Sequence, residues 1–189
     1  LLKTTPQPPH TEDCRFDPKT VRYVGTVYSR EAVLCWSLFP SVAAIFEQPV
    51  LHGPGYYVKA CRGVRSLGTI QPGAIKGVEY QPSEEGAFGY RLVFTDGEDA
   101  EYNLKIVDLT WNYYCHSLRD EIFEQKIISH KMSKLLRERS VYLRIGLGRS
   151  WKAFPDRCYL QITGIYTFPD HLGGKHFAHF APRRKPNSS

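Results

Sequence analysis

One stretch of this chain, residues 117–140, constrains the fold more than any other, because it has the only long helical pattern in the sequence. Its apolar residues recur at steps of three and four, which predicts an amphipathic helix over residues 117–139. Acidic residues crowd the first turns and basic residues the last, as the helix dipole favours. A second stripe of the same helix is basic and consists of Lys126, His130, Lys134 and Arg137.

The rest of the chain has mainly β patterns, with alternating apolar residues and an Asp96-Gly97 pair that is a strong hairpin signal. We expect strands over residues 21–28, 56–61, 74–80, 90–95, 100–109, 141–147 and 158–167, short helices near residues 30–39 and 42–48, and a connector at 111–116. The predicted fold class is α+β: a mainly antiparallel small β-barrel or bent sheet with the long amphipathic helix packed across it.

The predicted domain organisation has three parts. Residues 1–20 contain four prolines and no periodicity, which is typical of an extended leader. Residues 21–180 form one compact domain, or two abutting sub-barrels over about 21–110 and 141–180 that the helix joins. Residues 181–189 are a basic tail. The chain begins without a methionine or a signal segment, and we interpret it as a fragment.

The charge of the chain is divided unevenly. Residues 1–110 contain 11 Lys and Arg against 13 Asp and Glu, whereas residues 111–189 contain 14 against 6. The whole net charge of +6 therefore belongs to the predicted helix and to the residues C-terminal to it. Such asymmetry indicates a surface for a polyanion, most often nucleic acid, and the plain alternative is a solvated basic face.

Cations and aromatic residues occur together in the loop after the strand at 141–147. Its Trp151 and Phe154 lie among three cations, and an exposed ring there could stack on an unpaired base, or instead close the bottom of the barrel. The candidate nucleic-acid-binding residues are Lys126, His130, Lys134, Arg137, Arg149, Trp151, Lys152, Arg157, Arg183, Arg184 and Lys185.

The hairpin around Asp96-Gly97 resembles the last strands of Tudor-type chromatin-reader barrels, over residues 74–109 and chiefly through Phe94, Asp96 and Gly97. The resemblance implies a barrel and an aromatic cage with an acidic wall for a methylated side chain. Glu98 stands where such readers often have an aromatic residue. The candidate reader pocket consists of Phe94, Asp96, Tyr102 and Trp111. Tyr56, Tyr57 and other tyrosines could also line a recognition pocket, although tyrosines of a small β-rich domain more often lie at the rim of the core or in cross-strand pairs.

Catalytic and metal-binding signatures are absent from the sequence. Five cysteines are widely spaced and form no CxxC pair, as is typical of reduced thiols. His171, His176 and His179 lie close together, but their spacing matches a tetrahedral zinc site poorly, so the sequence leaves metal binding open. We expect no cofactor, and the sequence favours a protein without enzyme activity. No apolar run approaches the ~18 residues that a membrane helix needs.

These observations favour a non-catalytic nucleic-acid or chromatin-binding module in the nucleus, with DNA or RNA as partner. The alternative from another class is a protein-interaction domain that reads a methylated histone tail or binds an acidic protein. An enzyme with an unrecognised site is the third hypothesis.

Overall fold

A computed structural model of the chain describes residue 10 and residues 17–81, 89–118 and 124–180. The described part has an α+β fold, as predicted. Its helices are the 3-10 helix η1 (Pro18–Thr20), α1 (Arg30–Trp36), α2 (Val42–Phe46), α3 (Leu109–Ser117), α4 (Gln125–Arg137) and α5 (Phe177–Phe180). Its strands are β1 (Leu38–Phe39), β2 (Leu51–His52), β3 (Tyr56–Lys59), β4 (Leu67–Ile70), β5 (Ala74–Tyr80), β6 (Tyr90–Thr95), β7 (Glu101–Lys105), β8 (Ser140–Leu147) and β9 (Arg157–Phe168).

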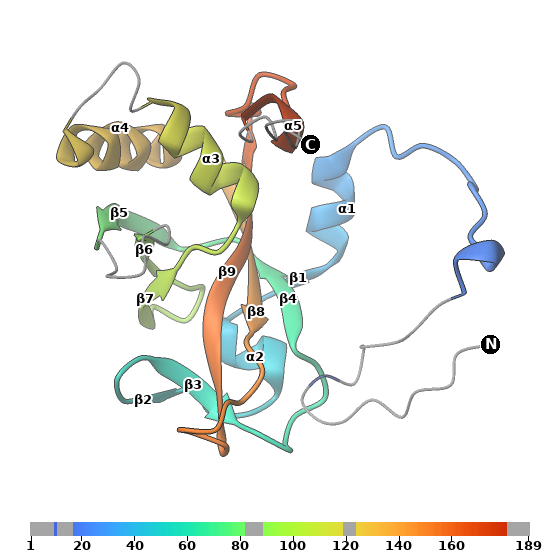
Figure 1. The fold of residues 1–189 in the computed structure, drawn as a ribbon, viewed down its shortest axis with the longest axis vertical. Helices are drawn as coiled ribbons and strands as arrows, with labels where there is room; N and C mark the ends of the chain where they lie inside the picture. The colour runs from blue at the N-terminus through green and yellow to red at the C-terminus, as the bar shows by residue number, and fades with distance from the viewer. Residues whose placement is uncertain (1–9, 11–16, 82–88, 119–123, 181–189) are drawn as a thin grey trace, which may run out of the picture.

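The strands of the described part form two open sheets and not the closed barrel that the sequence suggested. One sheet has the order β1-β4-β8-β9-β3-β2, and the other has the order β5-β6-β7. A parallel bridge between Ile106 and Ile162 connects them. The hairpin of β8 and β9 runs along the molecule in the middle of the larger sheet (Figure 1). Because β3 and β4 pair with β9 and β8, residues before and after the helical region share one sheet.

The single long helix predicted over residues 117–139 is not confirmed. Two helices occur instead: α3, whose C-cap is Leu118, and α4, whose N-cap is Glu124, with residues 119–123 outside the described part. The segment 111–116, predicted as a connector, lies within α3 because Asp108 caps that helix. One oxygen of Asp108 accepts hydrogen bonds from the backbone N–H groups of Thr110 (2.9 Å) and Trp111 (3.3 Å).

Helix α4 has the predicted apolar face, and this face seals one sheet edge. Ile128, Met132 and Leu136 are buried in the hydrophobic core. Beside them, Ser133 Oγ accepts a hydrogen bond from the backbone N–H of Val78 in β5 (2.7 Å). An unpaired edge strand is a site for unwanted pairing, and a helix that binds its backbone groups removes that hazard.

Residues 21–28, predicted as a strand, pair with no strand of the described part. They arch away from the sheets (Figure 1) and are exposed, with Tyr23 83% and Tyr28 98% accessible to solvent. The alternation of β-branched and aromatic residues there indicates a segment that suits a sheet, but a strand forms only where an edge is available to it. The sequence also missed the short strands β1, β2 and β4. No helix within the described ranges is both long and apolar enough to cross a membrane.

Candidate nucleic-acid interface

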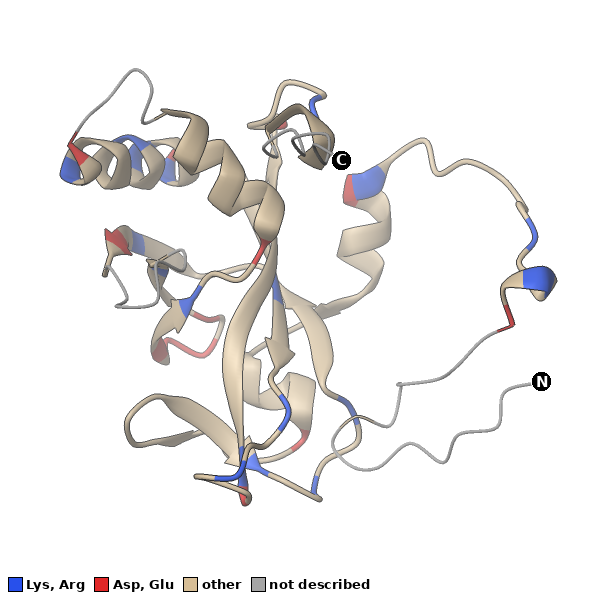
Figure 2. Cartoon of the chain, in the orientation of Figure 1, with Lys and Arg blue, Asp and Glu red and all other residues tan. Residues whose placement is uncertain are grey.

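The predicted basic residues lie in two groups at opposite ends of the molecule (Figure 2). Helix α4 is at the upper end in this view, whereas the loop between β8 and β9, residues 148–156, is at the lower end. The separation follows from the topology, since α4 leads into the start of β8 and the loop begins where β8 finishes. The sequence suggested one continuous surface, and the structure places its parts far apart. The tail residues Arg183, Arg184 and Lys185 lie outside the described part.

The basic stripe of α4 is exposed but is partly used for structure. Arg137 donates from Nε to the backbone oxygen of Ile75 (3.1 Å) and from Nη2 to that of Lys76, so its guanidinium holds the edge of β5. Lys134 forms an i,i+4 ion pair with Glu138 at 3.8 Å. Lys126 and His130 are exposed on the same helix. Among the described residues, no aromatic ring lies against any cation of this stripe.

The candidate reader pocket is not an open pocket in the structure. Phe94 and Tyr102 stack at a centroid distance of 5.6 Å inside the core, and Asp96 is buried. The carboxylate of Asp96 accepts the backbone N–H of Val42 at the start of α2 (2.9 Å) and those of Glu98 and Ala100 in its own turn. Burial, with the neighbouring Asp96, raises the pKa of Tyr102 to about 12. The Asp-Gly hairpin therefore anchors a helix against the sheet.

The loop at the lower end orients its large side chains by two consecutive turns. The backbone N–H of Phe154 donates to Trp151 O (3.0 Å), and that of Arg157 donates to Phe154 O (3.2 Å). A further hydrogen bond from Ala60 N–H to Asp156 O (2.9 Å) fastens the loop to the end of β3. The rings of Trp151 and Phe154 are in contact, with centroids 5.8 Å apart, and Trp151 is 57% exposed.

Strand pairing places further aromatic residues beside this loop. In the antiparallel pair of β3 and β9, Tyr57 lies opposite Tyr159 and Lys59 opposite Arg157, so all four side chains are on one face. The Arg157 guanidinium carbon lies 4.7 Å from the ring centre of Tyr57 and 4.8 Å from that of Phe154. The ring of Tyr159 contacts those of Tyr57 and Phe154. The cation is therefore held between two rings.

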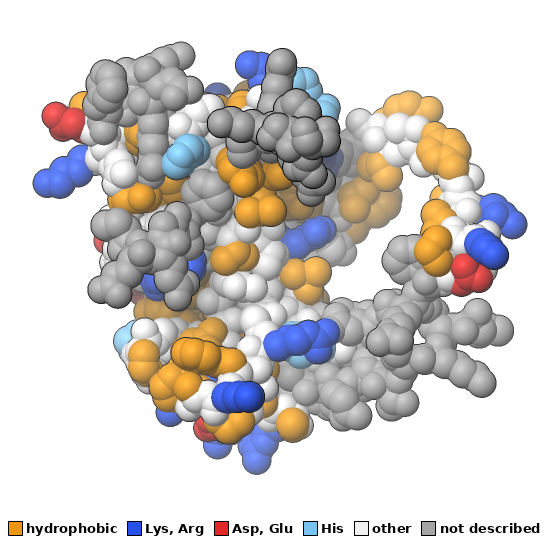
Figure 3. Space-filling model, viewed as in Figure 1, with side chains coloured by type: hydrophobic (Ala, Val, Ile, Leu, Met, Phe, Trp, Pro, Cys, Tyr) orange, Lys and Arg blue, Asp and Glu red, His pale blue; other side chains and the backbone are white. Residues whose placement is uncertain are grey.

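We define the basic–aromatic face as Tyr57, Lys59, Arg149, Trp151, Lys152, Phe154, Arg157 and Tyr159. Lys, Arg and hydrophobic side chains are interspersed at this end of the molecule (Figure 3). Arg62 adds an exposed cation in the segment after β3. The Asp156 carboxylate next to this face forms an ion pair with Arg157 (3.8 Å) and so offsets part of its charge. The face thus combines several cations with the exposed ring of Trp151 and the half-buried rings of Tyr57, Phe154 and Tyr159. Cations bind phosphates, and exposed rings stack on bases.

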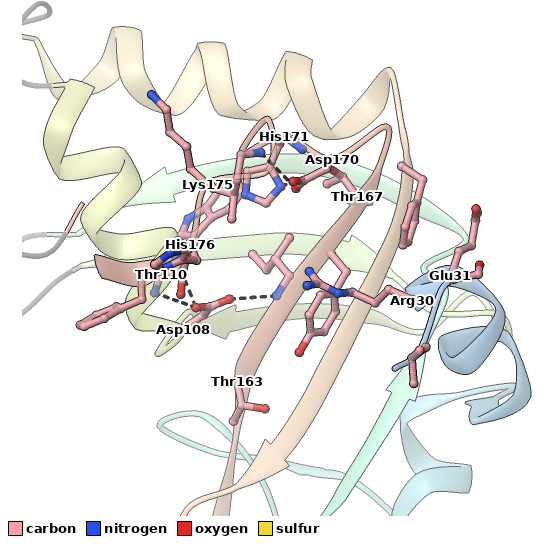
Figure 4. Close-up of a pocket in the computed structure, with 18 of the residues that line it drawn as sticks. Arg30, Glu31, Asp108, Thr110, Thr163, Thr167, Asp170, His171, Lys175 and His176 are labelled. Carbon is pink, nitrogen blue, oxygen red and sulfur yellow. Dashed lines mark hydrogen bonds between the residues drawn. The ribbon is translucent and has the colours of Figure 1, made fainter. Parts of the chain in front are cut away.

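A cavity of about 750 Å³ lies farther along β9, between that strand, the start of α1, the start of α3 and residues 170–177 (Figure 4). Arg30 reaches from α1 toward β9 in this view, and the Asp108 and Asp170 carboxylates stand on the cavity wall. Both carboxylates accept backbone hydrogen bonds: Asp108 from Ile165 N–H (3.1 Å), and Asp170 from Leu172 (3.1 Å) and Gly174 (2.9 Å). They serve as turn and helix caps.

His171 also lines this cavity, and its hydrogen bonds fix its tautomer. Thr167 Oγ1 donates its proton to Pro169 O (2.8 Å) and accepts the His171 backbone N–H (2.9 Å). Its contact with His171 Nδ1 at 3.1 Å therefore requires the proton to be on Nδ1. Burial lowers the pKa of His171 to about 4. The rings of His176 and His179 contact each other instead, and no group of three or more possible metal ligands occurs among the described residues.

Comparisons with known protein families, with curated proteins and with solved structures found no match to this chain.

Sequence reasoning identified the loop residues Arg149, Trp151, Lys152 and Arg157, but it did not connect them with Tyr57, Lys59 or Tyr159. The strand pattern predicted both β3 and β9, yet pairing between strands so distant in sequence has no local signal. The contacts of Arg30 in α1 and Arg144 in β8 with the ring of Tyr166 in β9 were missed for the same reason.

Proposed function

We propose that this chain is a non-catalytic nucleic-acid-binding module that holds a polynucleotide on its basic–aromatic face. The observation that supports this most directly is the guanidinium of Arg157 between the rings of Tyr57 and Phe154, beside the exposed ring of Trp151. Rings that stack on a guanidinium take only its faces and leave its edge for oxygen acceptors. Asp156 lies 3.8 Å from Nε of Arg157, so a phosphate would approach the guanidinium from its Nη side.

Each part of the face has a distinct physical task in this proposal. Arg149, Lys152, Arg157 and Lys59 contribute sequence-independent affinity by displacing counterions from phosphates. Trp151 contributes stacking with an unpaired base, at about 1–3 kcal/mol. The two turns of the loop hold these groups in place before binding, which lowers the entropic cost of association. For a nucleic-acid-binding module of this kind, we predict that the protein is located in the nucleus.

Helix α4 has a smaller part in the proposal than its charge alone suggested. Arg137 is bound to β5 and Lys134 is paired, so two of its four stripe residues have structural partners. Within the described ranges, the stripe also lacks the rings that would distinguish a polynucleotide from any other polyanion. We therefore assign the binding to the lower end of the molecule.

The test is a salt series of fluorescence anisotropy titrations with labelled DNA and RNA oligonucleotides. Wild-type affinity should fall steeply with salt, and the double variant Arg149→Glu/Lys152→Glu should lose at least ~10-fold at low salt together with part of the salt slope. The matched control, Lys126→Glu/Lys131→Glu on α4, makes the same charge change at the other end and should lose less than ~3-fold. Absence of wild-type binding at low salt, or equal losses in both variants, would refute the proposal.

A further inference from the structure

The basic–aromatic face continues upward along the β8–β9 hairpin. Residues that are directly opposite in an antiparallel pair point to the same side of the sheet. Tyr166 lies opposite Tyr142, and Gly164 lies opposite Arg144. The other side of the hairpin is core, since Leu143, Ile145 and their partners are buried.

A β-bulge keeps the lower and upper parts of β9 on one side. The register shifts by one residue between Arg144 and Ile145, which leaves Thr163 as the extra residue of β9. Without this shift, Tyr159 and Tyr166 would point to opposite faces, because they are seven positions apart and side chains alternate along a strand. With it, Arg157, Tyr159 and Tyr166 share the outer face. Figure 3 shows Lys and Arg side chains at intervals over this part of the molecule.

The upper part of this face repeats the cation–ring arrangement of the lower part. Tyr166 has the Arg30 guanidinium carbon 5.9 Å from its ring centre and that of Arg144 at 5.8 Å. Arg30 comes from α1 and Arg144 from β8, so the two cations approach the ring from different elements. A polynucleotide that reached this point would meet a second site of the same chemistry.

The surface between the two sites is hollowed. A hollow of about 250 Å³ is lined by Arg149, Gly146 and Thr163, together with His10, Ser66, Leu67 and Leu147. Thr163 also lines the 750 Å³ cavity next to Tyr166. The two concave regions therefore lie on either side of the bulged residue. Gly146 has no space for a larger residue, because a Cβ there would lie 2.8 Å from Thr163 Cγ2.

Resting on the proposed function, we infer that the ligand is a single-stranded nucleic acid that lies lengthwise along β9, from Trp151 to the Arg30–Tyr166–Arg144 cluster. β9 has 12 residues, which at ~3.3 Å each span about 40 Å. The track accommodates roughly six nucleotides, within the ~4–16 that single-strand-binding domains occupy. Phosphates lie against Arg30 and Arg144.

The cavity explains why the strand must be single. The Asp108 and Asp170 carboxylates on its wall repel phosphates, but they accept hydrogen bonds from the amino groups of bases. A base can enter this space only when it is unpaired, since a duplex keeps its bases stacked inside. Single-stranded DNA and RNA both offer phosphates and unpaired bases, and comparison of their affinities identifies the better ligand.

The experiment measures affinity against oligonucleotide length, with single strands of about 4, 8 and 12 nucleotides in both DNA and RNA. For the wild type, affinity should rise at least ~10-fold from the shortest to the middle length and then level off. Tyr166→Ala should remove that rise and leave the shortest oligonucleotide unaffected, whereas Tyr166→Phe, which keeps the ring, should behave as wild type. Arg30→Ala, on the exposed start of α1, is a second variant that leaves the sheet intact.

The outcomes separate this inference from the proposed function. Binding that the loop reversal Arg149→Glu/Lys152→Glu abolishes, but that is indifferent to length and to Tyr166→Ala and Arg30→Ala, would overturn the track and leave the module in place. Equal competition by a duplex would also overturn it. No binding at any length would remove the proposed function itself. A length-dependent rise that both variants weaken, in either DNA or RNA, supports the track.

Discussion

The two basic regions of this molecule contain similar residues and differ in what surrounds those residues. On α4 the cations point to solvent from a helix whose other face is core, and Arg137 is bound to the backbone of β5. At the lower end the cations lie among rings, and Arg157 is held between Tyr57 and Phe154. Both regions carry a positive net charge, so charge alone does not distinguish them. Only the partners of each cation distinguish the stripe that supports the fold from the face that we propose binds a ligand.

The sharpest test of this comparison is the buried face of α4. Leu136→Ala removes a side chain that is 1% exposed, and we expect a loss of about 2–5 kcal/mol in the free energy of unfolding. The measurement is urea denaturation, with Lys131→Ala on the exposed face as the control that changes stability by less than ~0.5 kcal/mol. The folded fraction should bind oligonucleotides as the wild type does. A stable but non-binding Leu136→Ala protein would contradict the assignment of α4 to packing.

Acid should destabilise the upper end through His171. Its pKa is about 4 in the folded protein against 6.5 in the unfolded chain, so the unfolded state binds more protons between these values. The free energy of unfolding should therefore fall as the pH decreases from 6.5 to 4, by roughly 3 kcal/mol in total from this group. His171→Gln should flatten this part of the pH profile of denaturant unfolding, and His130→Gln on α4 should not. Identical profiles for all three proteins would show that His171 is not buried in its neutral form.

A smaller effect distinguishes structural from electrostatic use of Arg137. Arg137→Ala loses the hydrogen bonds to β5, and we expect a cost of about 1–2 kcal/mol in thermal or urea unfolding. Arg137→Lys keeps the charge but not the planar fork, so it should lose most of the same stability. Oligonucleotide affinity should change no more in either variant than in Lys131→Ala. A selective loss of affinity in Arg137→Ala that Arg137→Lys restores would return α4 to the binding surface.

Much of the local structure could be read from the sequence. Alternation placed β5 and β6 at their observed bounds and located β3, β7, β8 and β9, because side-chain period is a property of the strand itself. The predicted apolar face, which included Ile128, Met132 and Leu135, was right for Ile128 and Met132, which are buried. In the last turn of α4, Leu136 is the buried residue and Leu135 is only partly buried. The division into α3 and α4 was missed because apolar residues continue from one helix to the other in the sequence. The start of α3 was missed because its cap, Asp108, also accepts a hydrogen bond from the distant Ile165.

What the sequence by itself determined is therefore the α+β class, the amphipathic face of α4 and the presence of cations and rings in the loop after β8. The tertiary structure decided which of these residues meet. Pairing of β3 with β9 brings Tyr57 to Arg157, and the bulge at Thr163 turns Tyr166 to the same side. The same structure buries Phe94 and Asp96, which their hairpin pattern alone could not reveal. The physical reason is that strand register and burial depend on contacts between segments far apart in the chain, for which local periodicity has no signal.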